Sequence, residues 1–216
     1  MKQITALFLF GALLLSGRAY GQGTCTGDCL NGTGTYTFPD GAKYEGQWQK
    51  GKPEGKGVFV WPNGTRYEGD FKNGKRHGSG KLDLPDKTRY EGSFKNDVIE
   101  GTGVTIYPDG KKYEGMHKKD LPNGKGKATW PDGSVYEGNF KNGKASGKGT
   151  QTWKDGSKYE GMWKDGLKRG GGSFTMPDGT RCMGKFKDDT INGPGFIITP
   201  DGKKRKAKFK DGKTVN

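Results

Sequence analysis

The two histidines are the first residues to examine for chemistry, because imidazole is a common general base and a frequent metal ligand. His77 follows Lys75 and Arg76 in a predicted turn, and His117 stands where the related segments of the chain have Trp or Phe. Neither histidine belongs to a cluster with the spacing of a metal site. We therefore expect no catalytic residue, no metal site and no cofactor.

The three cysteines point to structure rather than to catalysis. Cys25 and Cys29 lie four residues apart, and an oxidising compartment would favour a disulfide that closes this tight loop. Cys182 stands alone at a position that carries Tyr in six other segments. Cys25 and Cys29 are thus candidates for a structural disulfide, and Cys182 for a small hydrophobic core residue.

Six glutamates recur at one position of a repeating pattern, and repeated carboxylates could bind calcium or act as a glycosidase pair. They are Glu45, Glu68, Glu91, Glu114, Glu137 and Glu160. A Lys or Arg stands two residues before five of them, which places it on the same face of an extended strand. Alternating charges of this kind are typical of weak, solvated ion pairs, so we interpret the series as a surface ladder.

The elements that carry these residues are repeats. Tyrosines followed by Glu-Gly recur every 23 residues from Tyr44 to Tyr159, and Gly-x-Gly pairs keep the same step from Gly32 to Gly195. Eight units of 23 residues therefore span 32–215. Without this period, a hydrophobic content of 29% and a formal charge of +14 would indicate a disordered chain.

Each unit has the pattern of a β-hairpin, with period-two alternation on both sides of a Pro-Asp-Gly turn. A second turn, such as Asn73-Gly74, leads to the next unit. We predict an all-β fold, a single-layer antiparallel β-hairpin repeat array in the form of a twisted, elongated ribbon.

The aromatic residues support this prediction, because a disordered chain has no reason to space them regularly. Beyond residue 21, every ring except Phe196 occupies one of four positions of the unit, all on one face. Gly34 and Gly46 share that face, so we expect rings to lie flat over bare backbone. The predicted ring ladder includes Tyr44, Trp48, Tyr67, Phe71, Tyr90, Phe94, Tyr113, Tyr136, Phe140, Tyr159 and Trp163.

The motif Tyr-Glu-Gly-x-Trp/Phe-x-x-Gly, followed by Gly-x-Gly and Pro-Asp-Gly, resembles the MORN repeat (membrane occupation and recognition nexus) over residues 32–215. The resemblance implies a single-layer antiparallel β array without catalytic activity that serves as a scaffold, spacer or interaction surface. Binding of acidic phospholipids is proposed for some members of that family.

Three of the eight units differ clearly from the motif, one at its turn and two at the Tyr-Glu-Gly position. Residues 85–87 (Pro-Asp-Lys) lack the turn glycine, and residues 182–184 (Cys-Met-Gly) replace Tyr-Glu-Gly. The eighth unit reads Arg-Lys-Ala at 205–207, as expected of a polar unit that caps the array.

Residues 1–21 resemble a secretory signal peptide. Lys2 supplies the positive charge, residues 4–15 the apolar core, and Ala19-Tyr20-Gly21 the cleavage site. The apolar stretch is shorter than a membrane span. We predict a secreted or periplasmic protein, soluble after cleavage, with residues 22–31 as an N-terminal cap.

The excess positive charge is the remaining functional clue. We predict that clustered Lys and Arg residues form a basic edge that contacts an anionic partner: Lys72, Lys75, Arg76, Lys118, Lys119, Lys141, Lys144, Lys168, Arg169, Lys203, Lys204, Arg205 and Lys206. Such an edge suits an anionic lipid, an acidic polysaccharide or an acidic protein, and it also keeps strand edges from aggregating. No nucleic acid is expected for an exported chain.

These observations predict a non-enzymatic secreted or periplasmic scaffold that binds protein through an aromatic-lined face and the basic edge. One alternative is a peripheral membrane module that binds anionic phospholipid. Another is a targeting or regulatory partner of a separate enzyme. A homodimer through strand edges is compatible with each of them.

Overall fold

The computed structural model describes residues 23–215, which form 18 β-strands joined by short turns. These residues divide into two compact units, 23–101 with 119–121 and 102–118 with 122–215. The signal peptide predicted for residues 1–21 lies outside the described part of the chain. None of the described residues belongs to a helix that could cross a membrane.

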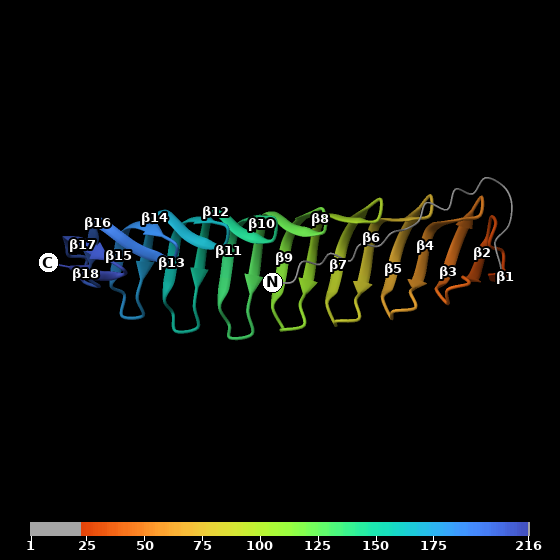
Figure 1. Cartoon of the computed structure of the whole chain (residues 1–216), viewed down its shortest axis with the longest axis horizontal. Coiled ribbons are helices and arrows are strands. Elements are labelled where there is room, and N and C mark those ends of the chain that lie inside the picture. Colours follow the sequence, from red (N-terminus) through yellow and green to blue (C-terminus); the bar gives the residue numbers. More distant parts are fainter. Residues whose placement is uncertain (1–22, 216) are drawn as a thin grey trace. The chain divides into compact units, whose positions relative to one another are not determined.

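The strands follow one another as a meander within each unit (Figure 1). The first unit holds β1 (Thr24–Gly27), β2 (Thr33–Thr37), β3 (Lys43–Gln49), β4 (Lys52–Val60), β5 (Arg66–Lys72), β6 (Lys75–Asp83) and β7 (Arg89–Lys95). Strand β8 (Val98–Ile106) contributes residues to both units, and so does β10, whose first residue, Leu121, belongs to the first unit. The second unit holds β9 (Lys112–Lys118), β10 (Leu121–Thr129), β11 (Val135–Lys141), β12 (Lys144–Thr152), β13 (Lys158–Lys164), β14 (Leu167–Thr175), β15 (Arg181–Lys187), β16 (Thr190–Ile198), β17 (Lys204–Lys210) and β18 (Lys213–Val215).

Neighbouring strands pair antiparallel from β1 to β7 and from β10 to β18. Each unit is therefore a single antiparallel layer of hairpins. The predicted all-β, single-layer hairpin array is confirmed.

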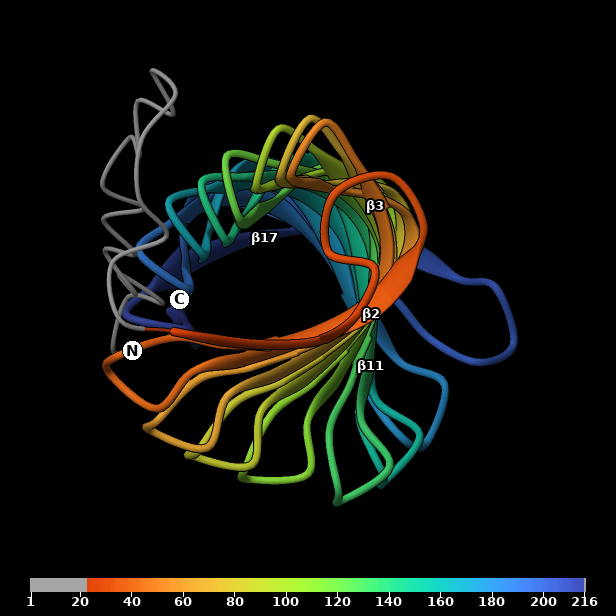
Figure 2. The same ribbon diagram turned by 90° about the vertical axis from the view of Figure 1, so that its right-hand side faces the viewer.

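Two kinds of turn alternate along the chain and lie at opposite ends of the strands (Figure 2). In the first kind, the Phe38 N–H donates to the Ala42 carbonyl (2.8 Å) and the Asp40 carboxylate accepts from the Ala42 N–H (2.9 Å). The second kind has two residues of positive φ, such as Asn73 (52°) and Gly74 (79°). This is the type I′ geometry, whose twist matches that of paired strands.

The type I′ turns also join successive repeats. The Gly74 N–H donates to the Pro53 carbonyl (2.8 Å). Each of the remaining turns of this kind has the same hydrogen bond, from an N–H of the turn to the carbonyl 21 residues earlier. Each repeat is thus held to the one before it by its turn as well as by strand pairing.

Tyrosine rings over paired glycines form the centre of the fold. Gly46 of β3 pairs with Gly57 of β4, and a Cβ added at either glycine would overlap the ring of Tyr44. The Tyr44 hydroxyl donates to the Gln47 carbonyl (2.9 Å), which fixes the ring in place. Tyr67, Tyr113, Tyr136 and Tyr159 repeat the arrangement over their own glycine pairs.

The second ring of each repeat couples neighbouring repeats. Phe71 meets Tyr44 of the preceding repeat and Tyr67 of its own edge to face, with centroids 5.0 and 5.1 Å apart. In the second unit Phe140 stands in the same way between Tyr113 (4.9 Å) and Tyr136 (5.0 Å). Edge-to-face pairs add stabilisation to that of burial alone, so each unit has its own continuous aromatic core.

A sulfur or an aliphatic side chain takes the place of the tyrosine ring beside the first strands and in the seventh repeat. Cys25 and Cys29 form a disulfide, and the Cys29 sulfur lies against Gly34, the glycine that pairs with Gly27 and Gly46. In the seventh repeat Cys182 is a buried free thiol, and the Ile191 side chain lies over Gly184.

Candidate interaction surfaces

The rings of the predicted ladder lie in the buried core of each unit. The eleven rings of the predicted ladder are at most 8% exposed, and Tyr44, Tyr67 and Tyr159 are fully buried. Burial raises the pKa of Tyr90 and of Tyr136 to about 12, so these hydroxyls remain hydrogen-bond donors. These eleven rings contact each other, whereas Trp61, Trp130 and Trp153 on the same face are only half-buried. Contact of this aromatic-lined face with a partner stays a prediction.

Arg76 is not part of a basic edge. Its side chain is buried, with Nη2 donating to the Asp97 carbonyl (2.6 Å) and Nε 3.4 Å from the Asp97 carboxylate. The guanidinium also lies 5.4–5.8 Å from the ring centroids of Trp61, Tyr67 and Phe94. The prediction for this residue is wrong, because Arg76 fills an inward position of β6 and needs an internal anion.

Lys168 occupies the equivalent position of β14, and only part of its side chain reaches solvent. Its Nζ lies 4.8 Å from the ring of Trp153 and 5.5 Å from those of Tyr159 and Phe174. Burial lowers the pKa of this amine, while the charge of Asp189 opposes the shift. Its cation is directed to the aromatic core rather than to a partner.

His117 serves as a ring of the core. It is 3% exposed and packs edge to face on Tyr113 with centroids 5.0 Å apart. Nε2 lies 3.0 Å from the Thr105 hydroxyl and Nδ1 lies 3.2 Å from the Gly115 carbonyl, which suits a neutral ring protonated on Nδ1. Burial lowers the pKa of His117 to about 4. The other histidine, His77, lies in β6 rather than in a turn.

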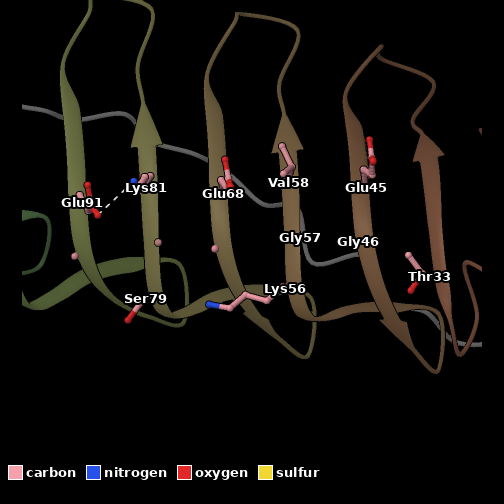
Figure 3. A pocket seen from close by; sticks show the side chains of 13 residues that line it. Thr33, Glu45, Gly46, Lys56, Gly57, Val58, Glu68, Ser79, Lys81 and Glu91 are labelled. Atoms are coloured by element: carbon pink, nitrogen blue, oxygen red, sulfur yellow. Dashed lines mark ion pairs between the residues drawn. The ribbon is translucent and has the colours of Figure 1, made fainter.

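The outer face of the first unit carries an open groove of about 740 Å³ (Figure 3). Its floor is the backbone of the paired glycines of β3 to β7, and the tyrosine rings lie on the opposite side of this backbone. Glu45, Glu68 and Glu91 form one wall, and Lys56 and Ser79 stand opposite. A smaller groove of about 410 Å³ crosses the equivalent glycines of the second unit, beside Lys148, Glu160 and Met162.

Five of the six glutamates of the ladder form ion pairs with neighbouring cations. Lys112 pairs with Glu114 (3.0 Å) and Lys158 with Glu160 (2.9 Å) along one strand. Other pairs cross between strands, such as Lys127 with Glu137 (3.2 Å). Exposed pairs of this kind are weak. Among residues 23–215 no group of three His, Cys, Asp or Glu side chains could hold a metal ion.

The ladder changes sign at the end of the second unit. Met183 and Lys206 occupy the glutamate position in the last two repeats, and Lys185 and Lys208 occupy the position two residues later. Within the described residues, Lys185, Lys204, Lys206 and Lys208 form no ion pair. Lys204 lies over the ring of Phe196, the aromatic residue outside the common pattern, at 4.0 Å.

The remaining predicted cations fall into two groups. Exposed residues at or beside type I′ turns are Lys72, Lys75, Lys118, Lys119, Lys141, Lys144 and, further along β14, Arg169. Lys203, Lys204, Arg205 and Lys206 are exposed at the other kind of turn and on β17. The structure therefore divides the predicted basic edge between two places.

Two features were not predicted from the sequence. The outer groove runs over the paired glycines of neighbouring strands, and the common step of the Gly-x-Gly and Glu-Gly glycines marks its course in the sequence. The burial of Arg76 also had a signal, because the same position holds Pro53, Ile99 and Ile191 in other repeats.

The chain belongs to the MORN repeat family. The family model matches eight consecutive copies at residues 30–43, 44–66, 67–89, 90–112, 113–135, 136–158, 159–181 and 182–204. The predicted membership is confirmed. Repeats of this family build scaffolds that interact with proteins or lipids.

Solved structures show only distant likeness. The TCP domain of SAS-4 from Drosophila melanogaster, solved with a proline-rich motif of Ana2, is 14% identical over 89% of this chain and 94% of that chain, with a TM-score of 0.38. The G-box domain of the microcephaly protein CPAP is 16% identical over 89% and 96%, with a TM-score of 0.38. A virginiamycin B lyase from Staphylococcus aureus is 13% identical over 86% and 72%, with a TM-score of 0.18. No curated protein matches the sequence significantly.

Proposed function

We propose that this protein is a secreted or periplasmic, non-enzymatic scaffold that binds a protein partner on its outer face and at its type I′ turns. The observation that carries the proposal is the different composition of the two faces of the sheet. Tyrosine and second-position rings hold the repeats together from inside, while charged side chains and a glycine-floored groove repeat across the opposite face. An extended face of this kind offers many shallow contacts to a large partner.

Photo-crosslinking tests the scaffold function. A benzophenone attached to Val58→Cys lies in the groove of the first unit, and the same label on Lys154→Cys lies at an exposed turn. With an extract of the source organism, we expect a specific protein adduct from position 58 and none from position 154. Absence of an adduct from labels placed across the whole outer face would contradict the proposal.

Binding to anionic phospholipid is the second candidate, and the exposed lysines at the type I′ turns favour it. Lys72 and Lys75 face each other beside one turn, and Lys141 and Lys144 beside another. Clustered lysines attract an anionic membrane surface, and salt weakens the attraction. Sedimentation with phosphatidylglycerol vesicles that disappears at high salt would favour this function, and no sedimentation at low salt would reject it.

The partner identified by crosslinking also decides the third candidate. An enzyme among the specific adducts would make this chain its targeting or regulatory partner. A structural protein would leave the scaffold function as proposed.

A further inference from the structure

Carboxylates stand beside the lysines on the outer face of the first unit. Lys56 of β4 lies opposite Asp70 of β5 in the ladder, and its Nζ is 2.7 Å from the Asp70 carboxylate. Glu54 lies beside the next type I′ turn, where its carboxylate accepts a hydrogen bond from the Asn73 N–H (2.8 Å). Each position has an equivalent in the second unit.

The lysines of the second unit have lost the first of these acids. Lys125 of β10 and Lys148 of β12 are the equivalents of Lys56. They lie opposite Asn139 and Met162 in their ladders. Neither of these side chains carries a charge, so the ion pair of the first unit has no counterpart at either lysine.

The second acidic position changes in the same direction. In the first unit it holds Glu54, His77 and Glu100, and in the second unit it holds Asn123, Ser146, Arg169 and Asn192. Both acids are therefore replaced by neutral or cationic residues.

The result is a patch of uncompensated cations in the middle of the second unit. Its members are exposed, alternate with inward side chains, and lie on β10 to β14: Lys125, Lys141, Lys144, Lys148, Lys164 and Arg169. Among residues 23–215 none of these six forms an ion pair. The neighbouring Glu137 and Glu160 are already paired with Lys127 and Lys158. We call these six residues the cationic patch.

The spacing of the patch suits a long ligand that crosses the strands. Lys125 and Lys148 are each the fifth residue of a nine-residue strand. The two strands are separated by one other strand, which places the lysines ~10 Å apart across the sheet. The smaller groove of about 410 Å³ begins beside Lys148 and has the glycine backbone as its floor, with Thr150 and Met162 at its sides.

The chemistry of this surface favours a linear acidic polysaccharide. A carboxylate on every second sugar recurs at about the step of the two lysines, because a disaccharide is similar in length to one hairpin. Backbone groups of the floor are used in strand pairing, so an extended peptide lying across them would find no partners for its own amides. Sugar hydroxyls stay in contact with water in an open groove and can bond to Thr150.

We propose that the cationic patch binds a linear polysaccharide with a carboxylate on every second sugar. The chain crosses the strands on the outer face, and Lys125 and Lys148 each contact one carboxylate. This site lies within the second unit and does not depend on the protein-binding function proposed above.

Fluorescence anisotropy with an end-labelled hyaluronan decasaccharide tests the charge contacts. The probe has a carboxylate on every second sugar, and the protein is the chain from residue 22 onward. We expect Lys125→Gln/Lys148→Gln to weaken binding at least ~tenfold, because two charge contacts are lost. The matched control, Lys56→Gln/Lys81→Gln, removes two outer-face lysines that already have acidic partners and should alter binding less than ~twofold.

A second pair of variants keeps every lysine. Asn139→Asp/Met162→Asp gives Lys125 and Lys148 the acidic neighbour that Lys56 has in Asp70. We expect ~tenfold weaker binding with unchanged far-ultraviolet circular dichroism, whereas Asp70→Asn should alter binding less than ~twofold. Unchanged binding in the double aspartate variant would overturn the proposal.

Other ligands decide the class of partner. A neutral chito-oligosaccharide of the same length should not bind, and affinity equal to that of hyaluronan would overturn the role of charge. A peptide with five glutamates that binds as tightly as the decasaccharide would overturn the choice of polysaccharide. So would binding to phosphatidylglycerol vesicles that needs Lys125 and Lys148 in the absence of hyaluronan binding.

The two proposed functions fail separately. No binding of hyaluronan at low salt would overturn the polysaccharide site. The crosslink from position 58 lies in the first unit, on residues that the Lys125→Gln/Lys148→Gln variant leaves unchanged. A specific crosslink without hyaluronan binding would therefore leave the scaffold function standing.

Discussion

The middle and the last repeats of the second unit use the same hairpin but fill its central position differently. In the repeat of Tyr136, the ring covers Gly138 and Gly149 and meets Phe140 and Trp163 edge to face at 5.0 and 5.1 Å. This repeat is closed by aromatic contacts on both sides.

The last two repeats lack that ring. Cys182 takes its position in the seventh repeat with Ile191 over the glycine, and exposed Arg205 takes it in the eighth. Ala207 then stands where the other repeats have glycine. Ala207 thus replaces the glycine in a repeat that has no tyrosine ring to lie over it, and the last two repeats give up this aromatic packing.

The largest difference in stability is expected when the central side chain is truncated in the repeat of Tyr136 and in the seventh repeat. We expect Tyr136→Ala to lower the free energy of unfolding by about 4 kcal/mol, since it empties a fully buried site that two other rings contact. Cys182→Ala, in the same unit, should cost only about 1 kcal/mol. Urea denaturation measures both values, and equal losses would contradict the difference between the regions.

The pH dependence of stability in acid should reveal the buried imidazole of His117. The pKa of His117 is about 4 in the fold against about 6.5 in an unfolded chain. The unfolded state therefore binds more protons between these values, and stability is lost as the pH falls from 6.5 towards 4, by about 3 kcal/mol in all.

The variant His117→Phe restores the residue type of the neighbouring repeats and should remove this loss. Thermal melting of both proteins between pH 4 and 7 is the measurement. A loss of the same size in the phenylalanine variant would show that other groups cause it.

Two glycines of the second unit should respond differently to a methyl group. A Cβ at Gly149 would overlap the Tyr136 ring, whereas nothing lies within 4 Å of a Cβ at Gly171. We expect Gly149→Ala to cost about 2 kcal/mol and Gly171→Ala to be neutral or stabilising by about 0.5 kcal/mol. The denaturant midpoint of Gly149→Ala should fall clearly below that of the unmodified protein, and the midpoint of Gly171→Ala should equal or exceed it; coincident midpoints of the two variants would refute this prediction.

The smallest effect is expected at the turn without its glycine. Lys87 holds a φ of 71° where the equivalent residue Gly64 holds 85°. A side chain in this conformation is strained, so Lys87→Gly should stabilise the protein by about 1 kcal/mol. Its mirror, Gly64→Lys, should destabilise by a similar amount, and a loss of stability in Lys87→Gly would argue against strain at this turn.

Much of the fold was readable from the period alone. A step of 23 residues fixes the hairpin, both turns and the shared face of rings such as Tyr44 and Trp48. The period is informative because residues at the same position of successive hairpin repeats point to the same face of the sheet. The spacing of residue types along the chain therefore predicts where their side chains lie.

The functional face was harder to read, because it depends on which residues the fold leaves exposed. Arg76 was assigned to an edge from its lysine neighbours, although most repeats have an apolar residue at its position and Asp97 takes the place of a turn glycine to pair with it.

A double-mutant cycle tests the central claim that rings on bare backbone hold the repeats together. Gly149→Ala is measured by urea denaturation in the natural chain and again in the Tyr136→Ala background. With the ring present, the methyl group should cost about 2 kcal/mol; with the ring removed, the cost should fall to about zero. The same cost in both backgrounds would contradict the claim.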